Sequence, residues 1–211
     1  MLYLVFEFFV HTYFYMVKTV CIFLLVIIAA PGFAQVNTKV YNQYLDFNEA
    51  QFKKQPNIAL QKADSILHNP EKLPAKAQIN FYRSLAKLYE DQDQPEKAIV
   101  YNKKVVAAVP DYFVAHRALG YLYLLPANGL VEKINQSKTN RVAYEKYQSQ
   151  YFRLIKTALP HLEKAEACDP DGQTLNLIKS LYQKMNDKTS LASLNNRLKL
   201  LKVHCIDLLT D

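Results

Sequence analysis

A short motif that occurs twice is the feature of this chain that most limits its fold. The pattern Leu-(Ala or Gly)-x-x-Tyr appears at residues 85–89 and again, 34 positions later, at residues 119–123. Each copy is followed by an alanine and, 12 positions after that alanine, by a proline. A fixed period of this length is typical of stacked helix–turn–helix repeats, in which neighbouring units bury a shared core.

The residue types in the motif have a physical explanation. A small residue, Ala86 or Gly120, lets two helices approach each other closely. Tyr89 and Tyr123 follow at i+3 on the same helical face, where they can fill the space beside the small residue. The proline after each copy ends a helix, because proline lacks a backbone N–H and disfavours helix at the residue before it.

The composition favours helices along the rest of the chain. Hydrophobic residues make up 50% of the 211 residues, and only four residues are glycine. Most of the nine prolines separate segments with helical periodicity. We therefore expect an all-α fold with helix pairs at residues 38–68, 75–109, 112–170 and 171–209. In the first pair we expect an apolar face formed by Tyr41, Tyr44, Leu45 and Phe52.

The third pair carries an insertion of about 26 residues between the motif tyrosine and the following alanine, compared with the first copy. Pro126-Ala127-Asn128-Gly129 predicts a turn. Residues 139–158 predict a helix that lengthens the second helix of the pair, with a kink at Pro160.

Two apolar stripes leave alternatives open. Tyr144, Tyr147 and Tyr151 either pack against the preceding helices, as periodic aromatic residues usually do, or form an aromatic docking surface. Apolar residues at steps of three and four over residues 191–208 predict a long amphipathic helix. That helix either caps the stack or mediates self-association.

The motif and its period resemble the tetratricopeptide repeat (TPR) family, whose members are docking scaffolds. The resemblance implies a right-handed α-solenoid of about three to four antiparallel helix pairs, whose first helices line a concave groove that binds a peptide or protein. Residues 38–68 lack the motif, as expected of a terminal repeat. Asn102 departs from the family pattern, which has a large aromatic residue at that place.

The resemblance also implies where a partner binds. Exposed places beside the two motifs correspond to Asn80, Arg83, Lys87, Glu90, Val114, Arg117 and Tyr121, and from these we predict Asn80, Arg83, Lys87, Arg117 and Tyr121 as the binding residues. Arg83, Lys87 and Arg117 would form a basic floor suited to an acidic peptide or a C-terminal carboxylate. An ordinary solvated surface is the alternative.

The N-terminal residues predict export. Met16-Val17-Lys18 is a short positive segment, residues 20–30 are apolar, and residues 31–34 place small residues at −3 and −1 before Gln35. This is the pattern of a signal peptide cleaved after Ala34. Residues 1–15 would then lie upstream of a start at Met16, and residues 35–211 would form a secreted or periplasmic, envelope-located repeat domain.

The alternative for residues 1–30 is a membrane anchor that stays attached, which would make the protein a membrane-anchored assembly factor. Glu7, His11 and Lys18 interrupt the apolar stretch and make a membrane span less favourable. We expect contact with a membrane only if this segment is retained.

No motif points to catalysis, a cofactor or a metal site. The five histidines lack the His-Glu-x-x-His spacing, there is no Gly-x-Ser-x-Gly elbow, and four glycines leave little material for a phosphate-binding loop. We expect a protein that is not an enzyme, and an enzyme with an unrecognised site is the remaining alternative. The net charge of +7 comes from basic residues scattered among acidic ones, which favours a solvated surface over a nucleic-acid-binding stripe.

Two cysteines, Cys168 and Cys205, remain after the predicted cleavage. Each is predicted near the C-terminal end of the second helix of its pair, and such helices lie side by side in a stack. An oxidising compartment would permit a disulfide between them. Two separate buried thiols are the alternative, because spacing alone does not fix the geometry.

Overall fold

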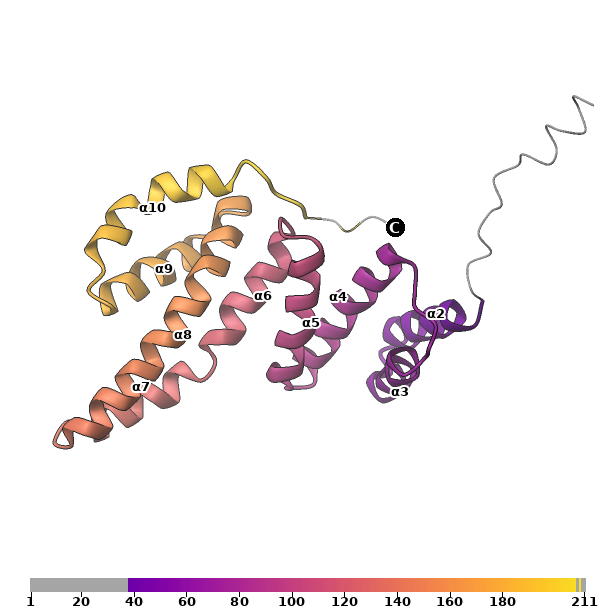
Figure 1. Ribbon diagram of the computed structural model, residues 1–211, viewed down its shortest axis with the longest axis horizontal. Coiled ribbons are helices and arrows are strands. Elements are labelled where there is room, and N and C mark those ends of the chain that lie inside the picture. The colour runs from indigo at the N-terminus through magenta and orange to yellow at the C-terminus, as the bar shows by residue number, and fades with distance from the viewer. Residues whose placement is uncertain (1–37, 208, 210–211) are drawn as a thin grey trace, which may run out of the picture. The chain divides into compact units, whose positions relative to one another are not determined.

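The computed structural model describes residues 38–207 and residue 209, and these residues form helices joined by short connections (Figure 1). The helices are α2 (Thr38–Phe52), α3 (Pro56–Leu67), α4 (Ala75–Asp91), α5 (Pro95–Ala108), α6 (Phe113–Leu124), α7 (Ala127–Gln136), α8 (Arg141–Cys168), α9 (Gly172–Lys184) and α10 (Lys188–Leu201). The described residues contain no strand, so the prediction of an all-α fold is confirmed for them. The predicted signal peptide, residues 1–34, lies outside the described residues.

Local sequence explains where several helices begin. Pro56 and Pro95 occupy the first turn of α3 and α5, where a missing backbone N–H costs no hydrogen bond. Asn140, Asp171 and Asp187 precede α8, α9 and α10, and each side chain accepts a hydrogen bond from the backbone N–H three residues later.

The same turn closes three of the helix pairs. Lys54, Asp93 and Asn186 follow α2, α4 and α9, and each has a positive φ of 52° to 55°. In each turn this residue donates to the carbonyl three positions earlier, and the next residue donates to the carbonyl five positions earlier. These two bonds define the Schellman motif, which ends a helix and reverses the chain.

An apolar core joins α2, α3 and α4. The rings of Phe47 and Phe81 lie 5.1 Å apart, edge to face, and both side chains are fully buried. The predicted apolar face of α2 was partly wrong, because Phe52 is 88% exposed and Leu45 is 49% exposed. The buried stripe instead runs through Val40, Tyr44, Phe47 and Ala50.

Helices α6 and α8 come close together at Gly120. A Cβ atom added to this residue would lie 2.6 Å from Leu162 Cδ2 and 3.2 Å from the Leu162 backbone nitrogen. Ala158, one turn earlier on α8, is fully buried, as is Ala98 on α5. The C-terminal half of α8 therefore packs on α6 as α5 packs on α4.

The insertion forms α7 and the N-terminal half of α8, which lie side by side (Figure 1). The predicted turn at residues 126–129 was wrong after Pro126, because α7 begins at Ala127. The predicted lengthening of the second helix was right, since α8 is a single helix of 28 residues that contains Pro160. On its tyrosine stripe, Tyr151 is buried and Tyr144 and Tyr147 are half-buried.

The last helix is shorter than the sequence pattern predicted. Helix α10 packs on α8 and α9 and ends at Leu201, not near residue 208. Residues 202–207 then run beside the start of α6, where Ile206 N donates to Asp111 O at 2.9 Å and Phe113 N donates to Ile206 O at 3.1 Å.

Replacing Gly120 by alanine should lower the free energy of unfolding by about 1–3 kcal/mol, because the new methyl group overpacks the contact with Leu162. Gly129→Ala is the matched control: no atom lies within 4 Å of its added Cβ, and alanine is the better helix former. Urea denaturation of both variants measures the difference. Equal stability of the two variants would contradict a close α6–α8 contact.

Candidate functional site

The structure places two of the predicted binding residues, Arg83 and Lys87, on the exposed surface of α4. Each has an internal partner. The Arg83 guanidinium lies near the Tyr112 hydroxyl, and Lys87 pairs with Asp91 one turn later on α4. A protein or peptide that binds Arg83 and Lys87 therefore has to displace these internal contacts.

The other three predicted residues are more firmly engaged. On α6, Arg117 donates to the Asp169 carboxylate and to the Asp169 carbonyl, both at 2.7 Å. Tyr121 has an exposed ring, and its hydroxyl shares a hydrogen bond of 2.8 Å with Thr174 Oγ1. Asn80 is only 6% exposed, so a partner cannot reach its side chain in this arrangement.

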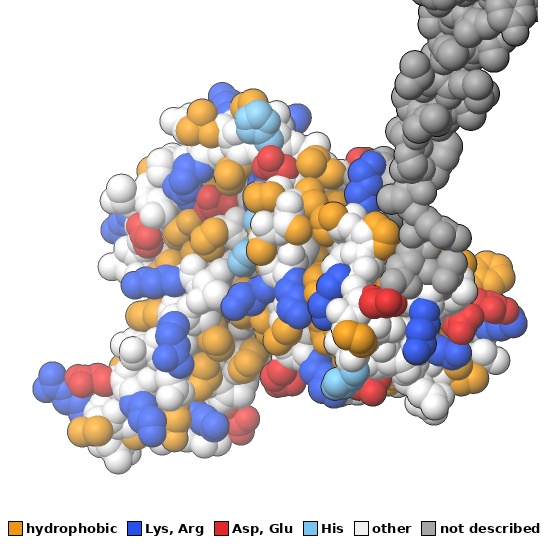
Figure 2. All heavy atoms as spheres, turned by 45° about the vertical axis from the view of Figure 1, so that its right-hand side comes forward, with side chains coloured by type: hydrophobic (Ala, Val, Ile, Leu, Met, Phe, Trp, Pro, Cys, Tyr) orange, Lys and Arg blue, Asp and Glu red, His pale blue; other side chains and the backbone are white. Residues whose placement is uncertain are grey.

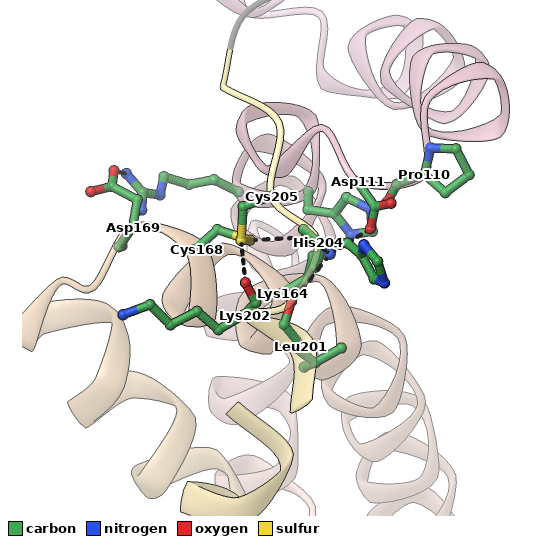
Figure 3. The surroundings of a disulfide bond; sticks show 11 residues. Pro110, Asp111, Lys164, Cys168, Asp169, Leu201, Lys202, His204 and Cys205 are labelled. Carbon is green, nitrogen blue, oxygen red and sulfur yellow. Dashed lines mark hydrogen bonds and ion pairs between the residues drawn. A yellow bond between two sulfur atoms is a disulfide. The ribbon is translucent and has the colours of Figure 1, made fainter. Parts of the chain in front are cut away.

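A disulfide joins Cys168, the last residue of α8, to Cys205 in the segment after α10 (Figure 3). The two sulfur atoms are 2.13 Å apart and the Cα atoms 5.5 Å apart. The sequence pattern predicted Cys205 inside a long final helix. In the structure, α10 has already ended at Leu201, and the extended segment brings Cys205 back to α8.

Lys164 ties the same segment to the connection before α6 (Figure 3). Its ammonium group donates to Asp111 Oδ1 at 2.7 Å, to the Leu201 carbonyl at 3.3 Å and to the His204 carbonyl. The hydrogen bond from Lys164 holds the pKa of the Asp111 carboxyl below its usual range. The Lys164 side chain is 8% exposed, so these acceptors compensate the cost of burying its charge.

Two histidines face each other across α6 and α8. His116 Nδ1 and His161 Nδ1 are 3.0 Å apart, and His116 Nε2 lies 3.0 Å from the Pro110 carbonyl. Because a carbonyl can only accept, His116 carries its proton on Nε2 and accepts at Nδ1 from His161. Burial lowers the pKa of both imidazoles, and for His161 burial and the nearby His116 lower it to about 4.

A cavity of about 520 Å³ opens between α8, α9 and α10, and we call it the α8–α10 cavity. Its apolar lining consists of Leu159, Pro160, Met185, Leu200 and Leu201. Its volume lies in the range of sites that hold a small molecule or an anchoring side chain.

A network of three side chains, Glu163, Tyr182 and Arg197, lines one part of this cavity. Arg197 donates to the two carboxylate oxygens of Glu163 at 2.7 and 2.9 Å, and the Tyr182 hydroxyl donates to Glu163 at 2.5 Å. Burial, and then the hydrogen bond to Glu163, raise the pKa of Tyr182, so its hydroxyl stays protonated. The charges compensate each other within the network.

Charged side chains are mixed on the surface. On the face shown in Figure 2, Lys and Arg side chains are spread over the described part of the molecule with Asp and Glu among them. Within residues 38–207 and 209 no group of three or more His, Cys, Asp or Glu residues is arranged to hold a metal ion. No helix in this part of the chain combines the length and the hydropathy that a membrane span needs.

Comparison of the chain with protein-family models, with curated proteins and with solved structures found no match. The resemblance to the TPR family therefore rests on the sequence motif.

Removing the disulfide should lower the free energy of unfolding by about 2–4 kcal/mol, because the bond closes a loop between cysteines 37 positions apart. Chemical denaturation with and without reductant measures this loss. The double variant Cys168→Ser/Cys205→Ser should not respond to reductant. Two reactive thiols in the denatured, unreduced protein would show that the bond does not form.

The histidine pair should make stability depend on pH. The pKa of His161 is about 4 when folded and about 6.5 when unfolded, so between these values the unfolded chain binds more protons. Stability should therefore be full above about pH 6.5 and fall as the pH drops toward 4. Urea denaturation at several pH values should show a smaller fall for His161→Gln, and an identical fall in both proteins would contradict the assignment.

Proposed function

We propose that this protein is a non-catalytic scaffold of the TPR type that binds another protein. The observation that carries the proposal is the recurrence of one local geometry. The same Schellman turn closes the pairs α2–α3, α4–α5 and α9–α10. Together with the interrupted pair α6–α8, these form consecutive helix pairs, which is the organisation expected of a right-handed α-solenoid.

The motif residues support the same proposal. Leu85 and Leu119 are fully buried, and the small residues after them, Ala86 and Gly120, are buried as well. Equivalent positions in two pairs thus have equivalent burial, as a repeat requires. The second copy of the pattern is interrupted by the insertion, and insertions in repeat arrays often carry function.

For the partner we propose an acidic peptide or a C-terminal carboxylate that binds beside α4. Lys87 and Asp91 have side chains that are 65% and 55% exposed, and an ion pair this exposed contributes little free energy. A carboxylate from a partner can therefore replace Asp91 at small cost. Arg83 lies one turn earlier on the same exposed side of α4.

We further propose that the protein works outside the cytoplasm, in the cell envelope or as a secreted protein. The disulfide between Cys168 and Cys205 supports this, because such bonds persist in oxidising compartments. A membrane-anchored assembly factor is the second candidate, since a retained N-terminal segment also agrees with the disulfide. The mass of the mature protein separates the two: a chain that begins at Gln35 supports cleavage.

The binding proposal is tested by cross-linked capture with residues 35–211 as bait, followed by affinity measurement with the captured protein. Arg83→Glu/Lys87→Glu should weaken binding at least about tenfold, and added salt should weaken binding to the unchanged protein. Lys103→Glu, at an exposed position on α5, is the control. Capture of no protein, or full affinity of the double variant, would contradict the proposal.

A further inference from the structure

The α8–α10 cavity has an apolar rim that is open to water. Leu200, on the last turn of α10, lines the cavity and is 75% exposed. Leu159 and Pro160 line it from α8. An apolar group that entered would cover this surface, and each Å² of apolar area removed from water contributes about 25 cal/mol.

The charged network in the cavity does not favour the binding of a charged ligand. Every N–H group of the Arg197 fork has a partner in Glu163, Tyr182, Ser190 or Ser193. An anion that displaced Glu163 would leave a buried carboxylate without its cation, which is costly. We therefore expect an uncharged, apolar group inside the cavity.

One backbone acceptor on α8 lacks its usual helical donor. Pro160 has no N–H, so it cannot form the hydrogen bond that residue i+4 normally donates to the Lys156 carbonyl. Lys156 and Pro160 both line the cavity. A backbone N–H from a bound peptide is a suitable donor to this carbonyl.

The surface beside the cavity is basic. Lys156 also lines a second hollow of about 490 Å³ along α8, together with Arg153 and Phe152. Neither Lys156 nor Arg153 forms a salt bridge with any residue of the described part of the chain, whereas Glu145 in the same hollow is paired with Arg141. The path that leads out of the cavity is therefore complementary to negative charge.

We propose that the α8–α10 cavity and the adjoining hollow bind one extended peptide segment of a partner protein. A bulky apolar side chain occupies the cavity, a backbone N–H of the segment donates to the Lys156 carbonyl, and acidic side chains lie against Lys156 and Arg153. This inference rests on the proposed function of protein binding and assigns to it a site separate from Arg83 and Lys87 on α4.

The test is selection from a displayed library of random peptides of about a dozen residues, with residues 35–211 as the target. Enriched peptides should combine Leu, Ile, Met or Phe with Asp or Glu a few positions away. Fluorescence anisotropy with the best synthetic peptide should then show at least about tenfold weaker binding to Leu200→Glu and to Lys156→Glu. Both positions are exposed, so the variants should fold normally.

Matched controls lie away from the cavity. Val100→Glu, at a half-exposed position on α5, and Lys103→Glu also replace an apolar residue and a lysine by glutamate, and they should bind the peptide with unchanged affinity. Circular dichroism of all four variants checks folding.

Other outcomes would overturn the inference. No enrichment, or equal binding by Leu200→Glu, shows that the cavity is not the site. Loss of peptide binding in Arg83→Glu/Lys87→Glu alone places the site on α4 and leaves the proposed function intact. Sedimentation that reveals a dimer, abolished by Leu200→Glu, shows that a second copy of the chain occupies the cavity instead.

Discussion

The contact between Gly120 and Leu162 is the constraint on which the central part of this structure depends. Helix α7 and the first half of α8 separate α6 from its partner along the chain, yet the backbone of α8 comes close to α6 because residue 120 has no side chain. This approach brings together two pairs of side chains from α6 and the C-terminal end of α8: Arg117 with Asp169, and His116 with His161. It also brings Tyr121 of α6 to Thr174 of α9.

Helix α8 links the local geometry to the proposed binding site, because it packs against α6, α7, α9 and α10. Its C-terminal end holds the chain after α10 through Cys168 and Lys164. With that segment fixed, the end of α10 is held beside Pro160, and the apolar cavity lies between them. Stability and the proposed recognition thus involve neighbouring turns of one helix.

Much of the helical layout could be predicted from the sequence, because prolines, polar turns and the paired motif act locally. The predictions were wrong at places where tertiary contacts determine the structure. Phe52 fits the periodicity of α2 but has no neighbouring helix to cover it in the described part of the chain. The apolar residues after Leu201 continue a helical pattern, yet that segment pairs with the start of α6 instead. The α8–α10 cavity gave no sequence signal, since residues from three helices form it.

Helix α8 is the second helix of the pair that α6 begins, despite the insertion between them. A nuclear Overhauser measurement on protein with labelled leucine methyl groups tests this pairing. We expect a strong cross-peak between the Gly120 Hα protons and a Leu162 δ-methyl group. Absence of this cross-peak, with Gly120 instead close to methyl groups of α7, would contradict it.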